Sequence, residues 1–193
     1  RKESSAASDV YKRQSLPSLI FLCVFINISS QSKTNKKSIT WKKDFKLSKA
    51  DFKGKVDVNS TNVAQTGANI IIVPFAKKSG KYLYRVYAKF YKYKSWINTD
   101  SKIVLNHEQI HFDITELYAR KMRKEIHKIK LSKKEVEEFD YRRIHKKFFK
   151  EFIAYQRKYD KETDFSRKFS VQKKWETSVK KQLSELKQFT LKN

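Results

Sequence analysis

The sequence predicts an α+β fold, in which an N-terminal antiparallel β-sheet is followed by a helical C-terminal half. Between residues 39 and 93, apolar side chains form short runs or alternate with polar ones, a pattern typical of strands. From Ile103 onward, apolar residues recur three or four positions apart, as on one face of a helix. The 193-residue chain is 39% hydrophobic, enough for one domain with a substantial core. We expect that domain to span residues 39–193, after a polar linker at residues 32–38.

The N-terminal residues have a different character. Residues 1–14 are polar and without pattern, which indicates a non-native extension. Residues 15–31 contain an apolar run that follows Lys12 and Arg13 and precedes small polar residues. This arrangement predicts a signal peptide, and therefore a secreted or periplasmic protein. The run is too short for a stable membrane span. It contains Cys23, the only cysteine, so a mature chain would offer no disulfide and no cysteine ligand.

The strand-forming half predicts a β-hairpin. Residues 70–73 are apolar and β-branched, and Pro74 ends the run. Residues 77–80, with the sequence Lys-Lys-Ser-Gly, are a candidate turn. Residues 81–91 then alternate, which places one apolar face on a second strand that can pair with the first. Residues 95–101 are expected to form a loop that leads into the helical half.

Three helices are predicted after that loop. The first spans about residues 102–129. The second is expected to begin after Ser132, because Ser132 and Glu135 have the spacing of a capping box, and to end near residues 155–159. The third spans about residues 170–186, with its apolar residues on one side.

The first predicted helix carries the most informative motif of the chain. His107, Glu108 and His111 form the pattern H-E-x-x-H, which zinc hydrolases use on a helix. Residues four apart lie on the same helical face, so His107 and His111 can bind one zinc ion together. A catalytic zinc site takes three protein ligands and keeps a position for water. Glu108 lies beside the ion, where it can accept a proton from that water.

The residues around the motif extend the pattern into a family resemblance. Leu105 to Arg123 has the sequence L-N-H-E-Q-I-H-F-D-I-T-E-L-Y-A-R-K-M-R and resembles the H-E-Q-x-H-F-D-I-A-E-L-Y-A-R segment of the bacterial domain-of-unknown-function 922 family. That family is described as predicted secreted zinc-dependent proteases with a zincin-like motif helix. Looser resemblances to its D-F-x-G, S-W, Y-D-x-E-T and Q-x-x-W segments occur at residues 51–54, 95–96, 159–163 and 172–175. The resemblance implies a zinc peptidase that acts on a peptide or protein substrate.

The third zinc ligand is left open by the sequence. After Y-D-x-E-T the family usually has a histidine, but Phe165 stands in that place here and cannot bind a metal. Residues 160–168 are expected to form a polar turn, in which Glu162 and Asp160 are acidic candidates. We prefer Glu162, because peptidases with two histidines and one glutamate are known. The alternative is that both carboxylates cap a helix or pair with lysines.

Other polar residues near the motif have less direct roles. Asp113 lies two residues after His111, so we expect it to point away from the metal and to anchor the helix through a hydrogen bond. Arg120 and Arg123 are expected to hold carboxylates within the fold. Tyr155 and Tyr159 are candidates for stabilising an oxyanion, with packing into the core as the alternative.

Two classes of function remain after these observations. The first is a secreted zinc metallopeptidase, in which zinc-bound water attacks a peptide carbonyl and Glu108 is the general base. The second is a catalytically reduced basic binding protein for polyanions, such as nucleic acid or a cell-surface polymer. The net charge of +25 and Phe165 favour the second class. The even spread of lysine and arginine argues against a single binding face and favours the first class.

Overall fold

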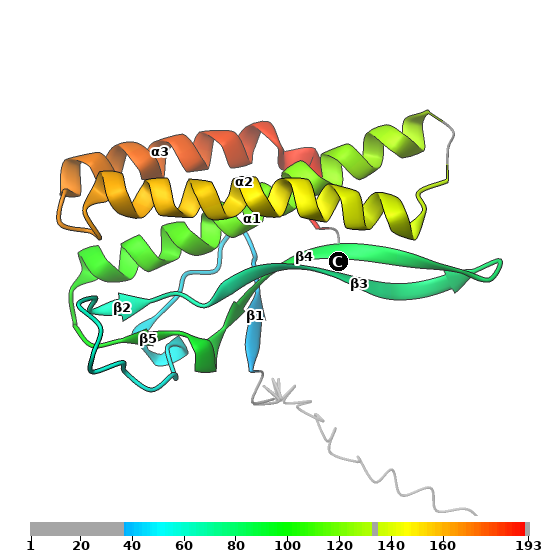
Figure 1. Cartoon of the computed structure of the whole chain (residues 1–193). Helices are drawn as coiled ribbons and strands as arrows, with labels where there is room; N and C mark the ends of the chain where they lie inside the picture. Colours follow the sequence, from blue (N-terminus) through cyan, green and yellow to red (C-terminus); the bar gives the residue numbers. More distant parts are fainter. Residues whose placement is uncertain (1–36, 133–134, 192–193) are drawn as a thin grey trace, which may run out of the picture. The chain divides into compact units, whose positions relative to one another are not determined.

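Two long antiparallel strands form the centre of the main sheet (Figure 1). β3 (Ala68–Lys78) and β4 (Lys81–Tyr91) are joined by Ser79 and Gly80, whose φ angles are 47° and 80°. Positive φ at both positions is the backbone of the two-residue turn that matches the twist of paired strands. β1 (Ser38–Thr40) pairs with the other edge of β4. The computed structural model, which describes residues 37–132 and 135–191, thus confirms the predicted hairpin, although β3 does not end at Pro74 but continues through it to Lys78 with an irregularity between Pro74 and Ala76.

A second, smaller sheet joins the hairpin to the helices. β2 (Ala64–Gln65) pairs antiparallel with β5 (Trp96–Ile97), so the predicted loop at residues 95–101 begins with a short strand. The buried hydroxyl of Ser95 accepts a hydrogen bond from the amide of Gly67 (2.9 Å) and donates one to the carbonyl of Tyr91 (2.8 Å). These bonds hold β2 and the start of β3 against the end of β4.

Three helices follow, in the predicted order. α1 (Lys102–Leu131) and α3 (Phe169–Glu185) agree with their predicted spans within two residues. α2 (Glu138–Thr163) begins five residues later than predicted, because Glu137 and Asp140 form its capping box. Ser132 instead ends α1, and its hydroxyl donates a hydrogen bond to the carbonyl of Ile129.

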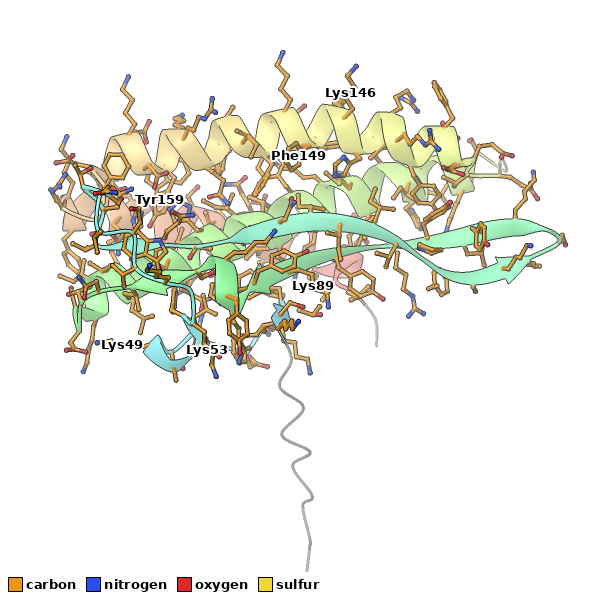
Figure 2. All side chains as sticks on the ribbon, turned by 60° about the horizontal axis from the view of Figure 1, so that its bottom comes forward. Lys49, Lys53, Lys89, Lys146, Phe149 and Tyr159 are labelled. Carbon is orange, nitrogen blue, oxygen red and sulfur yellow. The ribbon has the colours of Figure 1, made fainter. Side chains whose placement is uncertain are left out.

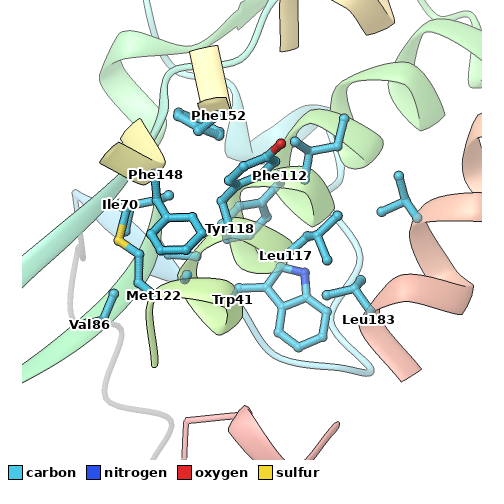
Figure 3. Close-up of a cluster of buried hydrophobic side chains, with 14 of the residues drawn as sticks. Trp41, Ile70, Val86, Phe112, Leu117, Tyr118, Met122, Phe148, Phe152 and Leu183 are labelled. Atoms are coloured by element: carbon cyan, nitrogen blue, oxygen red, sulfur yellow. The ribbon is translucent and has the colours of Figure 1, made fainter. Parts of the chain in front are cut away.

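All three helices contribute to one core on a single face of the main sheet. Val86, Ala88 and Phe90 of β4 are buried in the core that α1 covers, whereas their odd-numbered neighbours face the other way. α1 lies between the sheet and the other two helices (Figure 1). Figure 3 shows Leu117 and Met122 of α1 in this core, and both are fully buried. The α+β prediction is confirmed.

Residues Asn35–Asn193 form a compact unit with this core of their own. The predicted extension (1–14), the predicted signal peptide (15–31) and most of the predicted linker (32–38) lie outside the described residues. Within the described ranges, every helix is too short or too polar to cross a membrane.

Candidate metal centre

The motif histidines lie on α1 and face the C-terminal part of α2. His107 and His111 are one helical turn apart, and Asp160 of α2 approaches them from across the helix pair. The three side chains adjoin a cavity of about 460 Å³, which also contacts Glu108 and the segment at residues 61–66. The remaining walls come mainly from the facing side of α2 and from residues 165–167. The site therefore joins the small sheet to the helices.

Three potential metal-binding atoms converge at this position. The Nε2 atoms of His107 and His111 are 3.1 Å apart. Oδ1 of Asp160 lies 3.2 Å from the first and 2.8 Å from the second. Ligand atoms about 2.1 Å from a tetrahedral zinc ion would be about 3.4 Å from one another. A small outward movement of the three side chains is thus enough for them to share one ion.

A hydrogen-bonded glutamine orients one of the histidines. Gln156 donates from Nε2 to the backbone carbonyl of His111 (3.0 Å), so its Oε1 must act as the acceptor. Oε1 lies 2.6 Å from Nδ1 of His111, which therefore carries the proton and donates it. In the neutral ring, Nε2 of His111 is then left with a lone pair that points toward Asp160 and His107. A hydrogen bond of this kind is also the outer contact that histidines in metal sites usually make.

Two histidine nitrogens and one carboxylate oxygen, each able to offer a lone pair, thus meet at one point. Lone pairs on all three atoms would repel one another unless a proton or a metal ion lay between them. Burial alone would lower the pKa of His111, but its contacts with Asp160 and Glu108 outweigh burial and raise that pKa. Burial would likewise raise the pKa of Asp160, but hydrogen bonds to His107 and His111 hold it well below its usual range. The electrostatics of the site thus favour positive charge at this point.

Glu108 is held beside the cluster with one oxygen free. Its side chain is buried, and its Oε2 atom makes no hydrogen bond to any part of the chain that the structure describes. A buried carboxylate oxygen without a partner is uncommon and calls for an explanation. The backbone carbonyl of Glu108 accepts a hydrogen bond from Thr66 (3.4 Å), which connects the motif to the wall of the cavity.

The opposite face of α1 is anchored to the N-terminal part of the domain. Asp113 accepts hydrogen bonds from Nε1 of Trp41 (2.7 Å) and Nε2 of Gln109 (2.9 Å). Oε1 of Gln109 accepts in turn from the amide of Leu47 (2.8 Å). Burial raises the pKa of Asp113 despite these hydrogen bonds. The expectation that Asp113 anchors the helix is confirmed, and this anchor directs the motif histidines toward α2.

Further along α1, a buried ion-pair cluster fixes the helix to its neighbours. Glu116 accepts from Arg120 and Arg123, each at 2.9 Å. Arg120 also donates to the carbonyl of Leu183, and Arg123 donates to the carbonyl of Val86. The expectation that both arginines hold carboxylates within the fold is confirmed.

Tyr159 packs against the motif rather than entering the cavity. Its ring stacks on His107 at a centroid distance of 4.5 Å, and its hydroxyl donates to the carbonyl of His107 (3.5 Å). Burial raises the pKa of Tyr159 far above its usual range, so the hydroxyl stays protonated. Tyr155 bonds to Gln182 (3.0 Å). Neither tyrosine lines the cavity, so the packing alternative describes them better than the oxyanion role.

The structure does not bring Glu162 into the cluster. Glu162 is exposed, and its carboxylate accepts a hydrogen bond from Nε1 of Trp175 (2.8 Å) and lies 3.7 Å from the ammonium of Lys158. Because α2 continues to Thr163, residues 160 and 162 lie about 200° apart around the helix. The preference for Glu162 as third ligand is therefore corrected: Asp160, the other candidate from the sequence, lies with the two histidines.

Gln156 was not identified from the sequence, although a signal for it exists. It precedes Asp160 by four residues, so a helix through both positions places them on one face. Because residues 160–168 were predicted to form a turn, Asp160 was not expected on the helix, and its four-residue spacing from Gln156 was not recognised.

Phe165 lies at the rim of the cavity in an unusual backbone conformation. Asp164, Phe165 and Ser166 have φ angles of 49°, 51° and 77°, in the left-handed region that side chains other than glycine seldom adopt. The amide of Phe165 donates to the carbonyl of Asp160 (3.0 Å), and that of Lys168 donates to the carbonyl of Thr163 (2.9 Å). These bonds close the end of α2, and the ring of Phe165 is exposed and lines the cavity.

Comparison with known protein families places these residues within one domain. Residues 89–167 match the model of a family described as a bacterial protein of unknown function (DUF922). This stretch of the chain is similar to that family's domain. The DUF922 match contains the motif helix, Gln156, Asp160 and Phe165, and it confirms the resemblance seen in the sequence for that stretch. The looser resemblances at residues 51–54 and 172–175 lie outside the DUF922 match. Neither the curated proteins nor the solved structures include a match to this chain.

Proposed function

We propose that this DUF922 domain is a zinc-dependent peptidase with His107, His111 and Asp160 as its metal ligands and Glu108 as its general base. The observation that carries the proposal is the convergence of three metal-binding atoms beside a carboxylate with an unpartnered oxygen. The donor set of two histidines and one carboxylate fits a catalytic zinc site, since a fourth position remains for water. A bound zinc ion would polarise a carbonyl and lower the pKa of its water to about 7.

Glu108 is suited to the proton transfers of peptide hydrolysis. Its Oε2 atom faces no donor among the described residues, so it can accept a proton from the attacking water. The same carboxyl group can then pass that proton to the leaving amine nitrogen. Tyr159 and Gln156 hold the ligand histidines by stacking and hydrogen bonding, and thereby keep the cluster in place before substrate binds.

The form of the cavity supports an extended substrate. The segment at residues 61–66 lines it, and the only partner of β2 among the described strands is β5. A peptide can add to such a strand edge through backbone hydrogen bonds. Val104, Phe152 and Ile153 supply apolar walls for side chains of the substrate. An extracytoplasmic location completes the proposal, and the apolar run within residues 15–31 supports it.

The test combines metal analysis with hydrolysis of a mixed peptide library, read by mass spectrometry. The parent protein is expected to bind one zinc ion per chain and to cleave peptides. Glu108→Gln should keep the zinc and lose cleavage by at least about 100-fold, because it removes the proton acceptor and not a ligand. His107→Ala should lose both. Cleavage by Glu108→Gln at the parent rate would falsify the mechanism.

Metal identity needs its own measurement. Two histidines and one carboxylate also bind iron(II) in a different class of enzyme. Elemental analysis of protein purified without added metal is expected to find zinc, and activity should return with zinc and not with iron after chelation. If iron alone restored peptidase activity after chelation, the assignment of zinc would be contradicted.

A further inference from the structure

The end of the β3–β4 hairpin extends beyond the helices that cover the rest of the sheet. Figures 1 and 2 show the hairpin passing the ends of α1 and α2. Every residue from 74 to 83 is exposed, whereas the same strands are buried or half-buried on the helix-facing side nearer the core. Residues 74–85 are called the distal hairpin below. Because this element contributes little to the core, its composition is free to serve another role.

Large apolar side chains are exposed on the distal hairpin. Phe75, Tyr82 and Leu83, the apolar tip residues, are 46%, 55% and 39% exposed. Tyr82 and Leu83 are consecutive in β4 and project from opposite faces, so large apolar side chains are exposed on both faces of the hairpin near its turn. A surface of this kind on a soluble domain marks an interaction site.

The charge of the main sheet is entirely positive. β1, β3 and β4 contain no aspartate or glutamate, but β3 and β4 carry five lysines and arginines. Lys81 is paired with Glu135 (2.6 Å) and Glu137 (2.9 Å). Lys77, Lys78 and Arg85, the tip cations, make no ion pair with any described carboxylate. The partner of the distal hairpin is therefore expected to be anionic.

The apolar tip residues distinguish between anionic partners. Bases of single-stranded nucleic acid stack on open aromatic faces. Here Arg85 lies 4.1 Å from the centroid of the Phe75 ring, and Lys77 lies 5.6 Å from that of Tyr82, so both rings already have a cation over one face. Leu83 offers no stacking surface. An exposed aliphatic residue next to aromatic rings and lysines instead matches the boundary between lipid headgroups and acyl chains.

We propose that the distal hairpin docks the domain on an anionic lipid bilayer. The apolar tip residues enter the boundary between headgroups and acyl chains, and the tip cations contact lipid phosphates. The metal cluster lies near the other end of the hairpin, since Ala68 at the start of β3 lines its cavity. Ten residues of strand separate Ala68 from Lys78, about 33 Å at 3.3 Å per residue. Docking therefore leaves the cavity open, and the inference does not depend on the peptidase proposal.

Vesicle co-sedimentation tests the inference. The protein is used from residue 35 onward, because that unit has its own core and lacks the apolar run within residues 15–31. Vesicles of phosphatidylcholine with three-tenths phosphatidylglycerol should bind it, and vesicles of phosphatidylcholine alone should bind it much less. Replacing Phe75 and Leu83 together by serine should weaken binding by about tenfold, through lost apolar burial. Lys77→Gln and Lys78→Gln should each weaken it by about fivefold.

Matched controls separate the hairpin from the general charge of the domain. Phe169→Ser removes an aromatic residue that is 57% exposed on α3, away from the hairpin. Lys146→Gln removes an exposed lysine of α2, which Figure 2 shows on the outer side of that helix. Both controls should bind vesicles like the parent protein. The proposal would be overturned if the controls and the hairpin variants lost vesicle binding equally, or if the hairpin variants bound vesicles as well as the parent protein.

Nucleic acid provides the competing outcome. A single-stranded oligonucleotide should compete weakly with the vesicles, and its binding should not depend on Phe75 and Leu83. Tight oligonucleotide binding that is lost in the Phe75 and Leu83 variant would replace the bilayer with nucleic acid as the partner. Circular dichroism of each variant checks that the fold is retained, and the exposure of all substituted side chains predicts that it is.

Discussion

Replacing Asp160 by alanine should abolish the stabilisation of the domain by zinc, whereas replacing Glu162 should not. Zinc that binds only the folded state stabilises it by about 2.7 kcal/mol when its concentration is 100 times the dissociation constant. For a domain of about 150 residues, this corresponds to a rise of about 5–10 °C in melting temperature. Asp160 supplies one of three converging atoms, at 2.8 and 3.2 Å from the two histidine nitrogens.

The loss expected for Asp160→Ala follows from these figures. Removing an outer partner of a ligand typically weakens metal binding by about 10–100-fold, so the loss of a ligand itself should weaken it by at least about 100-fold. At the same zinc concentration, the stabilisation then falls to about 0.4 kcal/mol, or about 1 °C. Calorimetry of each variant with zinc and with chelator measures the difference.

Glu162→Ala is the matched control, since it removes a carboxylate two residues away on the same helix. It deletes the hydrogen bond from Trp175 (2.8 Å), at a cost of about 1 kcal/mol with zinc and with chelator alike. The rise in melting temperature that zinc causes in Glu162→Ala should equal the rise in the parent protein. The reasoning is refuted if Glu162→Ala loses this rise and Asp160→Ala keeps it.

Three other outcomes follow from the structure. In the metal-free protein, the raised pKa of His111 stabilises the fold at pH values below 6.5, the ordinary pKa of histidine, and this stabilisation is lost as the pH rises through the folded-state pKa. The lowered pKa of Asp160 stabilises the fold at pH values above 3.8, the ordinary pKa of aspartate, and this stabilisation is lost as the pH falls through the folded-state pKa. Denaturant titrations should thus show decreasing stability of the metal-free protein from pH 6 to 8, and added zinc should reverse that trend, because the ion replaces the proton. Phe165→Gly should raise the free energy of unfolding by about 0.5–1 kcal/mol, measured by urea titration, because glycine adopts positive φ without strain; a lower value would mean that the ring itself stabilises the loop. Gly67→Ala should lower the free energy of unfolding by about 1–3 kcal/mol, since the new Cβ would lie 2.6 Å from the carbonyl oxygen of Lys94. An unchanged melting temperature would show that the backbone segments around Gly67 and Lys94 separate freely.

Most of the fold follows from local patterns in the sequence. The hairpin is predicted by alternation and by Ser79-Gly80, because a two-residue turn with positive φ needs a permissive residue. α1 is predicted by its periodicity, and in the structure Ser101 caps it. The start of α2 is not, because the sequence pattern indicates a cap at Ser132, whereas the helix begins after Glu137. The choice between them depends on tertiary contacts, including the pairing of Glu135 with Lys81.

The candidate site was predictable where its residues share one helix. His107, Glu108 and His111 lie within five residues, so helical spacing alone places them together. The third member comes from another helix, and its identity depends on the phase of α2 relative to α1. A difference of two residues along α2 moves a carboxylate from the cavity to the solvent, and the sequence alone does not fix that phase.

The three converging atoms also connect two helices at the end opposite their covalent connection. His107 and Asp160 are 53 residues apart, with one near the start of α1 and the other near the end of α2. An ion shared by them would act as a cross-link that closes this long loop. By the chain-entropy estimate used for disulfides, such a closure stabilises the native state by about 4 kcal/mol. Because Cys23 is the only cysteine in this sequence, a bound metal ion would be a reversible cross-link where two cysteines could form a disulfide.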